Sequence, residues 1–434
     1  MTSLLFDWLT RDGKLLLVAK IVRTFAYGFL SVILAIYLKL IGFDEFLIGI
    51  ILTTTLLNSV IFTLIASFYA DKIGRRKFLL IYAALMSVSG LIFAVSENYT
   101  VLVIAAFIGT INITGTETGA FLTIEQAILP QTLNNVRKRN TIFAIYNMAG
   151  TLAMAIGVLL SGLPAILQQH LQYFNIVLNQ IDSIKLLFIL YSLLGILLIG
   201  IYQLLSYKIE VQKDKGEDKS DSNLFTRQKI KEKTKRSSLS PQSKGIVLRL
   251  SGLFAVDSFA GGFVIQGIVS FWFFTRFGAD LTTLSYIFSI AGVLTAFSYI
   301  AAAKIADKIG LINTMVFTHI PANILIIGVA FAPTLSVAII LYLVRMALSQ
   351  MDVPTRQSYI VAVVREEERT SAAGITNISR NATQAISPSL VGILIHSLSL
   401  SAPFVIGGVL KVAYDMALFL NFRKVKTREE EDQK

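Results

Sequence analysis

The sequence contains no cysteine and has few charged residues. Of its 434 residues none is Cys, and only 15% are Asp, Glu, Lys or Arg. The absence of cysteine excludes disulfides, a thiolate metal site and a cysteine nucleophile. Soluble domains usually carry about 25% charged residues, so the low charge excludes a soluble multidomain protein of this length.

Apolar residues take the place of the missing charges and make up 54% of the chain. They form twelve long runs, and a membrane-spanning helix needs about 20 such residues. The runs cover 15–38, 47–69, 78–96, 101–124, 141–163, 184–207, 246–275, 282–303, 312–332, 335–353, 371–397 and 402–420. A transmembrane β-barrel would alternate apolar and polar residues instead. The pattern therefore predicts an all-α membrane protein with twelve transmembrane helices.

The net charge of +12 is unevenly divided among the connections between these runs. Basic residues gather in every second connection and at both ends of the chain, whereas the remaining connections hold only Lys39 and Arg276. The positive-inside rule places the basic set in the cytoplasm. We therefore expect a multi-pass protein of the plasma membrane with both termini cytoplasmic.

The segment 208–245 is the one long polar stretch. It is rich in Lys, Ser, Asp and Glu and cannot bury a core, which predicts a cytoplasmic linker. Its basic residues are also compatible with a patch for anionic lipid or nucleic acid; we expect membrane lipids and no nucleic acid as partners. The linker separates a predicted six-helix bundle at 1–207 from a second at 246–422, and a cytoplasmic tail at 423–434 follows.

Three motifs recur in the two halves at nearly constant spacing. The sequence ADKIG occupies 70–74 and again 306–310, and Phe-Ala-x-Gly-Phe occupies 25–29 and 259–263. Asn147 and Gly162 match Asn377 and Gly392. The common order indicates the duplication of a six-helix unit, which is typical of transporters.

The connection at 66–77 resembles the signature of a known family. It reads Ala-Ser-Phe-Tyr-Ala-Asp-Lys-Ile-Gly-Arg-Arg-Lys and is similar to the pattern G-x-x-x-D-[RK]-x-G-R-[RK] of the major facilitator superfamily, although Ala66 or Ser67 replaces the leading glycine. The stretch 351–359, with Asn377 and Arg380, is similar to one prokaryotic branch of that superfamily without an assigned substrate. The resemblance implies two pseudo-symmetric six-helix bundles around a central cavity.

The resemblance also implies that this connection and its second-half copy act as a latch between conformations. A glycine after the Asp permits a tight turn between two helices, and the basic run lies at the membrane interface. The alternative is that the loop only anchors the topology. The predicted latch residues are Asp71, Gly74, Arg75, Arg76, Asp307 and Gly310.

Five ionisable residues lie deep inside the predicted spans. Each is roughly 8–11 residues from the cytoplasmic end of its helix, or about 12–16 Å at 1.5 Å per residue, near the middle of a core about 30 Å thick. Such residues are costly in a membrane and mark functional sites, although structural ion pairs are the alternative. The predicted substrate and proton site comprises Arg23, Glu117, Asp257, Arg345 and Arg380. By the family resemblance, the first, fourth, seventh and tenth helices line the cavity.

The repeat suggests how some of these charges pair. Arg23 and Asp257 each precede the phenylalanine of their motif by two residues, so we expect them to pair across the interface of the two halves. Asp352 and Arg356 are one helical turn apart and are predicted to pair locally. We expect Lys20 to extend toward the membrane surface, and Glu125 to pair with an arginine of the loops.

Within the site, Glu117 and Asp257 are suited to carry a proton, because desolvation and a nearby arginine act in opposite directions on a carboxylate. Glu117 is the predicted carrier, since Asp257 has the expected partner Arg23. Asp257 is the alternative carrier. The three arginines are also suited to the carboxylate or phosphate of an anionic substrate, since a guanidinium binds such groups through two hydrogen bonds.

These features together predict a secondary transporter that moves a small organic solute by alternating access, with proton coupling. The phosphate-binding pattern G-x-x-x-x-G-K-[ST] is absent, which argues against ATP-driven transport by this chain. We expect no enzymatic activity and no cofactor, and no metal because the three histidines lack ligand spacing. The expected partners are the solute, protons and lipids, and we expect a monomer.

The direction of transport is open at this point. Gly150, Gly157 and Gly162 before Pro164 loosely resemble the glycine- and proline-rich motif of proton-driven antiporters, which slightly favours export. Uptake of an organic anion is the alternative, and a membrane receptor or scaffold without transport is a third reading. A receptor should tolerate neutralisation of Glu117 or Arg23.

Overall fold

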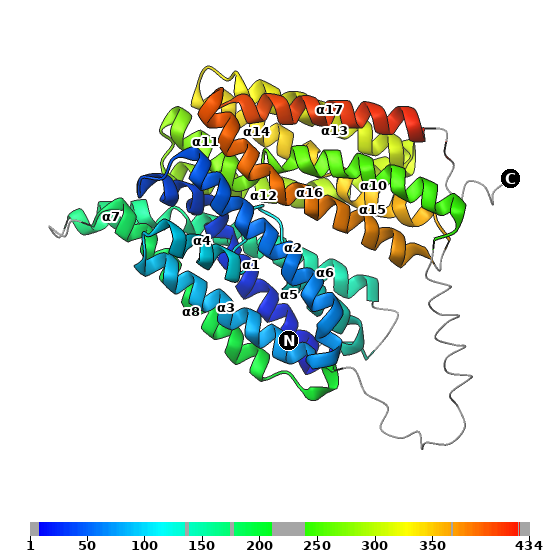
Figure 1. Ribbon diagram of the computed structural model, residues 1–434, viewed down its shortest axis with the longest axis horizontal. Helices are drawn as coiled ribbons and strands as arrows, with labels where there is room; N and C mark the ends of the chain where they lie inside the picture. The colour runs from blue at the N-terminus through cyan, green and yellow to red at the C-terminus, as the bar shows by residue number, and fades with distance from the viewer. Residues whose placement is uncertain are drawn as a thin grey trace.

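The computed structural model describes residues 8–134, 139–173, 178–210, 239–365, 368–423 and 425 as a bundle of helices (Figure 1). The helices of the first half are α1 Arg11–Leu40, α2 Glu45–Ile73, α3 Arg75–Val95, α4 Tyr99–Ile108, α5 Ala120–Ile128, α6 Arg139–Leu160, α7 Leu163–Gln172 and α8 Gln180–Gln203. Those of the second half are α10 Pro241–Gly262, α11 Gln266–Phe277, α12 Leu281–Ile309, α13 Leu311–Ala330, α14 Leu335–Ser349, α15 Asp352–Ala362, α16 Arg369–Ser397 and α17 Ala402–Phe422. Short 3₁₀ turns occupy Leu129–Thr132 and Tyr207–Ile209.

Ten helical segments of this bundle are long and apolar enough to cross a membrane. They account for ten of the twelve predicted spans and bear out the all-α membrane fold. The two other predicted spans differ for separate reasons. The run 101–124 is interrupted by irregular backbone after Ile108, and α16 is continuous but polar along one side.

The polar side of α16 is explained by its packing against α10. Ser379, Thr383 and Ser387, spaced one turn apart, donate hydrogen bonds to the carbonyl oxygens of Ser251, Ala255 and Phe259 at 3.1, 3.1 and 2.7 Å. Small hydroxyl residues let two helix backbones approach closely and join them where water is absent. The helix therefore needs less apolar surface than a lipid-facing span.

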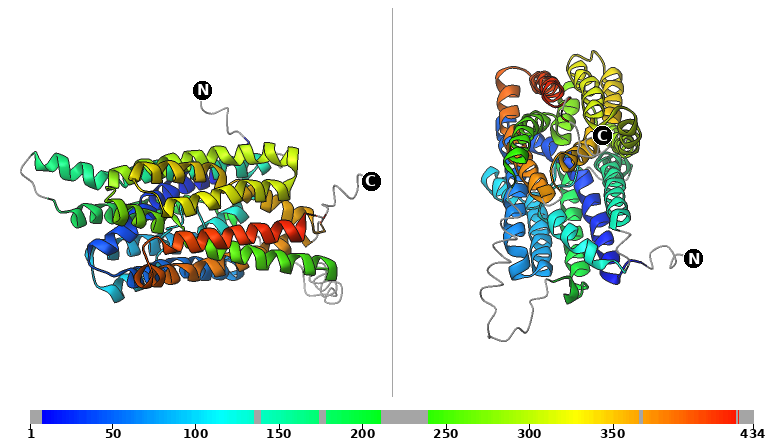
Figure 2. Two further views of the ribbon diagram at one scale, coloured as in Figure 1. Left: turned by 90° about the horizontal axis from the view of Figure 1, so that it is seen from above. Right: turned by 90° about the vertical axis from the view of Figure 1, so that its right-hand side faces the viewer.

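Most helices pack chiefly with others of their own half, but α2 packs most extensively with α16 and α12 with α6, each in the other half. In Figure 1 α1–α8 occupy the lower part of the bundle and α10–α17 the upper part, and the two further views in Figure 2 show the helices running alongside one another. Packing within the first half includes α1 with α6 and α3 with α8, and packing within the second half includes α10 with α16 and α13 with α17. Residues 211–238 of the predicted linker, and 424 and 426–434 of the predicted tail, lie outside the described residues.

The two copies of the ADKIG motif end equivalent helices. Gly74 follows α2 with a φ of 125°, and Gly310 follows α12 with a φ of 84°. Both angles are readily adopted only by glycine, and in both places the next helix begins at once. The repeat inferred from the sequence is thus also a repeat of local structure.

The two halves meet at one end of the bundle, which we call the far end because it is opposite the start of α1 and the end of α17. Hydrogen bonds there join Gln266 to Ser31 at 2.9 Å and Ser389 to Thr53 at 2.8 and 2.7 Å. A Cβ atom on Gly49 of α2 would lie 2.6 Å from the carbonyl oxygen of Pro388 in α16. This end is therefore tightly closed between the halves.

Candidate functional site

The fourth predicted span is broken at the depth of its glutamate. Between α4 and α5 the backbone of 109–119 is not helical, and Gly115 and Gly119 have φ angles of 77° and 111°. Asn112 accepts hydrogen bonds from the amide and hydroxyl of Thr114, each at 2.9 Å, and donates to the carbonyl of Thr116 at 2.8 Å. Such side-chain bonds compete with helical ones. The sequence signal was three glycines and four threonines within eleven residues, which a search for apolar runs overlooks.

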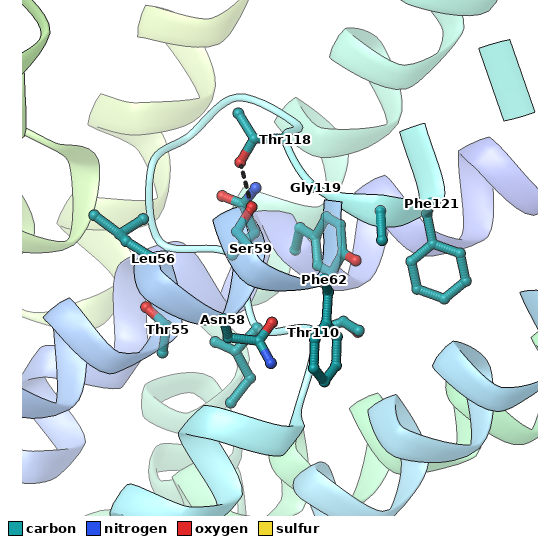
Figure 3. Close-up of a pocket in the computed structure, with 13 residues that line it drawn as sticks. Thr55, Leu56, Asn58, Ser59, Phe62, Thr110, Thr118, Gly119 and Phe121 are labelled. Carbon is teal, nitrogen blue, oxygen red and sulfur yellow. Dashed lines mark hydrogen bonds between the residues drawn. The ribbon is translucent and has the colours of Figure 1, made fainter. Parts of the chain in front are cut away.

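This irregular segment is held by neighbours in both halves. Asn58 of α2 donates to the carbonyl of Phe107, and Gly267 of α11 donates its amide to the carbonyl of Ile113 at 3.1 Å. Figure 3 shows the segment arching over α2, where the hydroxyls of Ser59 and Thr118 are 3.4 Å apart. The cavity beside it has a volume of about 20 Å³, enough for about one water molecule. Non-helical backbone at membrane depth is tolerated where protein or a polar cavity surrounds it.

Arg23 of α1 is the centre of a buried group that we call the Arg23 cluster. Its Nε donates to Glu117 at 2.6 Å, and its two terminal nitrogens bind both oxygens of Glu125 at 2.8 and 2.7 Å. Lys20 Nζ contacts the second oxygen of Glu117 and lies 4.3 Å from the centre of the Tyr146 ring. The cluster comprises Lys20, Arg23, Glu117, Glu125, Tyr146 and Tyr202.

The two glutamates of this cluster differ in how firmly they are held. Glu125 is fully buried and, besides Arg23, accepts hydrogen bonds from the hydroxyls of Tyr146 at 2.5 Å and Tyr202 at 2.6 Å. Glu117 lies on the irregular segment, is 5% exposed, and is held by two long cationic side chains. Glu125 is thus held by side chains of three helices, α1, α6 and α8, whereas Glu117 is held by two side chains of α1 alone.

Asp257 of α10 is the centre of the Asp257 cluster in the second half. Lys411 of α17 binds one of its oxygens at 2.6 Å, and Arg380 and Arg356 approach the other at 3.3 and 3.7 Å. Arg356 is also paired with Asp352 one turn earlier. The cluster comprises Asp257, Asp352, Arg356, Arg380 and Lys411, so three cations face two carboxylates.

Arg345 of α14 belongs to neither cluster. Its side chain is nearly buried, its Nε has no hydrogen-bond partner, and one terminal nitrogen lies 3.3 Å from the sulfur of Met346. The ring of Tyr342 is 6.0 Å away. Within the part of the chain that the structure describes, no carboxylate is paired with Arg345, so its charge is uncompensated.

The structure corrects several pairings inferred from the sequence. The predicted pair of Arg23 with Asp257 is wrong, because each has its counter-ions within its own half. The five mid-depth charges consequently form two clusters and one isolated arginine instead of one site. Lys20 is buried against Glu117 and does not reach the membrane surface.

The partners of Glu125 and Asp352 were also predicted from the sequence. Glu125 pairs with Arg23 of α1 and not with a loop arginine, so that prediction is wrong. The local pair of Asp352 and Arg356 is confirmed. Lys411 was missed, although an ionisable residue inside the last apolar run is itself a signal of function.

In the described residues, the hydrogen bonds and ion pairs of the predicted latch residues are made within their own half. Arg75 binds Asp71 at 2.7 Å, and Arg76 donates to the carbonyl of Tyr202 at 3.2 Å. Glu210 caps the start of α3 by accepting from the amides of Arg75 and Arg76 at 2.6 and 3.1 Å. The equivalent Asp307 and Gly310 are exposed.

The three glycines that suggested export lie in α6 and in the turn after it, and each packs closely against another helix. A Cβ atom on Gly157 would lie 1.9 Å from the carbonyl oxygen of Phe25, and one on Gly150 would lie 2.3 Å from Lys20 Cε. A Cβ on Gly162 would lie 2.8 Å from the hydroxyl of Ser285 in the second half. Close helix packing accounts for these glycines without reference to the direction of transport.

Comparison with known proteins extends these observations. Residues 16–351 match the family model described as Major Facilitator Superfamily. A membrane protein of Saccharomyces cerevisiae, described as uncharacterized, is 28% identical over 98% of this chain and 96% of its own length. This relative is from yeast, so it does not support a purely prokaryotic branch.

Solved structures show the same fold. The D-xylose-proton symporter has a TM-score of 0.72 at 15% identity, with 94% of this chain and 96% of that chain covered. The nucleoside transporter NupG has a TM-score of 0.69 at 14% identity, with 96% of this chain and all of that chain covered. At these identities the likeness concerns the fold alone.

Proposed function

The chain belongs to the major facilitator superfamily, and from this premise we propose that it is a proton-coupled secondary transporter of a small organic solute. Transport proceeds by alternating access between the two halves, with the solute held near the middle of the membrane. Broken helices at that depth are typical of transporter binding sites. A structural neighbour is by name a proton symporter, which supports proton coupling.

The contacts between the halves support one assignment of conformation. The halves are joined at the far end, and the latch residues bind partners of their own half. If the basic connections are cytoplasmic, this is the state that is closed toward the outside. In our proposal the latch joins the halves only when the cytoplasmic end closes, and the far-end contacts then break.

The observation that carries the proposal is the position of Glu117. This carboxylate lies on irregular backbone and is held by Lys20 and Arg23, while Glu125 provides Arg23 with a permanent second counter-ion. Protonation of Glu117 would release both cations: Arg23 would keep Glu125 as its counter-ion, whereas Lys20 would lose its paired carboxylate and retain the ring of Tyr146. Conversely, a movement of the broken helix away from α1 would separate Glu117 from Lys20 and Arg23 and raise its affinity for a proton. Proton binding and conformation are thereby coupled.

Transport in proteoliposomes tests this proposal. The purified protein is offered labelled D-xylose, uridine and succinate, with and without a pH gradient. We expect accumulation of at least one solute that disappears when a protonophore collapses the gradient. The orientation of the effective gradient then distinguishes symport from antiport.

Two matched variants sharpen the test. Glu117→Gln should retain exchange of unlabelled for labelled solute but lose gradient-driven accumulation at least tenfold. Glu97→Gln is the control, because its partner Lys185 and its side chain are partly exposed. A protein that moves no solute in either assay, and tolerates Glu117→Gln, would fit a receptor or scaffold and contradict the proposal.

An organic anion is the second candidate substrate class, and Arg345 favours it. A buried cation without a counter-ion is unstable unless an anion joins it. The Asp257 cluster of the same half also carries more cations than carboxylates. If succinate is the substrate, Arg345→Gln should raise its KM at least tenfold, whereas Arg276→Gln, at an exposed arginine, should not. An unchanged KM in Arg345→Gln would exclude this role.

A further inference from the structure

A histidine, an aspartate and an asparagine form a buried group between α13 and α17. His319 Nδ1 lies 2.9 Å from Asp415 Oδ1, and Asn323 Nδ2 donates to Asp415 Oδ2 at 2.8 Å. Their side chains are 3%, 1% and 0% exposed, respectively. We call these residues the His319 group. It contributes to neither of the clusters described above.

The position of the group argues against a purely structural role. An apolar contact between α13 and α17 would hold them together without the cost of burying a carboxylate. The group also leaves the Oδ1 atom of Asn323 without a hydrogen-bond partner, so its polar atoms are incompletely satisfied. Ionisable residues inside a membrane are costly and mark ion or proton pathways.

The group is connected to the Asp257 cluster through α17. Lys411 lies one helical turn before Asp415 on the same face, and its ammonium binds Asp257 at 2.6 Å. Ionisable side chains thus follow one another from His319 of α13 to Asp415 and, one turn away, Lys411 of α17, and from there to Asp257 of α10. The series ends at the helix that, by the superfamily's arrangement, lines the cavity.

The surroundings of the group contain charges of both signs. Lys411 and Tyr414 come from α17 itself, and the ring of Tyr414 is 6.2 Å from that of His319. The helix α14, which also packs against α13, contributes Arg345 and Tyr342, and these contact each other instead. The ionisable residues of the remaining neighbouring helices are Lys244, Arg249 and Asp257 of α10, Tyr286, Tyr299, Lys304, Asp307 and Lys308 of α12, Asp352, Arg356 and Tyr359 of α15, and Arg369, Arg380 and His396 of α16.

We propose that the His319 group is a second proton-binding site, which takes up and releases one proton during the transport cycle. This inference rests on the proposed proton-coupled function. In the unprotonated form, neutral His319 donates its Nδ1 hydrogen to the Asp415 carboxylate, and the pair carries one negative charge. A proton added at Nε2 gives an imidazolium beside the carboxylate, and the pair becomes neutral.

This change of charge is transmitted to the cavity through Lys411. When the His319 group is unprotonated, the negative charge of Asp415 attracts Lys411 as Asp257 does. When the group is protonated, that competition weakens, and Lys411 is held by Asp257 alone. Proton binding at the His319 group thereby strengthens one ion pair of the Asp257 cluster.

Histidine NMR in lipid nanodiscs observes the proton directly. The chain has three histidines, and the other two, His170 and His396, are exposed. In a His170→Gln/His396→Gln background, only the His319 imidazole remains. We expect its resonances to move from the neutral to the imidazolium form between pH 5 and pH 9, and Asp415→Asn to weaken proton binding about tenfold. An imidazole that keeps one protonation state across this range would overturn the proposal, and this outcome needs no variant of the group itself.

Transport of whichever panel solute the protein carries is the second measurement. We expect Asp415→Asn and His319→Gln to lower accumulation driven by a pH gradient at least tenfold, while exchange without a gradient stays within twofold of wild type. His396→Gln is the matched control and should behave as wild type. Titration of His319 combined with unchanged accumulation in Asp415→Asn would overturn the role in coupling.

The two measurements also separate this inference from the function on which it rests. A wild-type protein that transports no panel solute would contradict the proposed function, while the NMR titration would still decide whether His319 binds a proton. Transport that depends on Glu117 but not on Asp415 would overturn the second site and leave the function intact.

Discussion

Removal of Arg23 should destabilise the protein chiefly because Glu125 would lose its cation. Both side chains are fully buried and are joined by two hydrogen bonds of 2.8 and 2.7 Å. Loss of one partner of a buried ion pair costs about 3–5 kcal/mol, since the other charge remains buried. We therefore expect Arg23→Met to lower the free energy of unfolding by that amount.

The double variant gives the magnitude a clear test. Replacement of both members by apolar residues of similar size is often neutral, so Arg23→Met/Glu125→Leu should be more stable than either single variant. The coupling energy should lie at the upper end of the range of about 0.5–3 kcal/mol found for residues in contact. Arg23→Met and Asp257→Asn share no contact partner and should be additive within about 0.5 kcal/mol.

Reversible unfolding in mixed detergent micelles, followed by tryptophan fluorescence, measures these free energies. The reasoning is refuted if Arg23→Met/Glu125→Leu is destabilised by the sum of its single effects. Strong coupling between Arg23 and Asp257 would also refute it, because that result would restore the pairing across the two halves that the repeat alone suggested.

Two other predictions concern packing and acid stability. Gly157→Ala would bring a Cβ atom within 1.9 Å of the Phe25 carbonyl oxygen, and it should lower the free energy of unfolding by at least the roughly 1–3 kcal/mol typical of overpacking. Gly200→Ala is the control and should be tolerated, because no atom lies within 4 Å of the added Cβ. Equal melting temperatures of the two variants would contradict this prediction. Although burial opposes its ionisation, hydrogen bonds from Ser243 and from backbone amides lower the pKa of Glu368 to about 2, below the usual value of about 4.3 for an unfolded chain. Glu368 therefore stabilises the fold above about pH 4, and this contribution is lost as the pH falls toward 2. The difference in unfolding free energy between wild type and Glu368→Gln, measured at several pH values, should shrink over that interval. A difference that stays constant would contradict the assignment.

The broad architecture could be predicted from the sequence because the bilayer dictates it. A span must be apolar for about 20 residues, and ten such helices are found. The turns at Gly74 and Gly310 could also be anticipated, since the repeated motif ends in a residue that permits a positive φ. These features depend on local composition and not on which helices touch.

The pairing of charges could not be predicted in the same way. The repeat relates Arg23 to Asp257, but a position along a helix does not give the direction of a side chain. Glu117, which binds Arg23, lies on the broken part of the fourth span, where side-chain bonds of Asn112 and Thr114 compete with helical ones. Lys411 and Asp415 escaped notice because two charges of opposite sign in a long apolar run hardly alter its hydropathy.

The central claim is that protons move with the solute through Glu117. The most direct measurement uses proteoliposomes that contain a pH-sensitive dye, to which a transported solute of the panel is added without any imposed gradient. The account predicts that solute entry changes the internal pH in wild type, and that Glu117→Gln still exchanges solute but moves no protons with it. Solute entry that leaves the internal pH of wild-type vesicles unchanged, or an unaltered proton movement in Glu117→Gln, would contradict it.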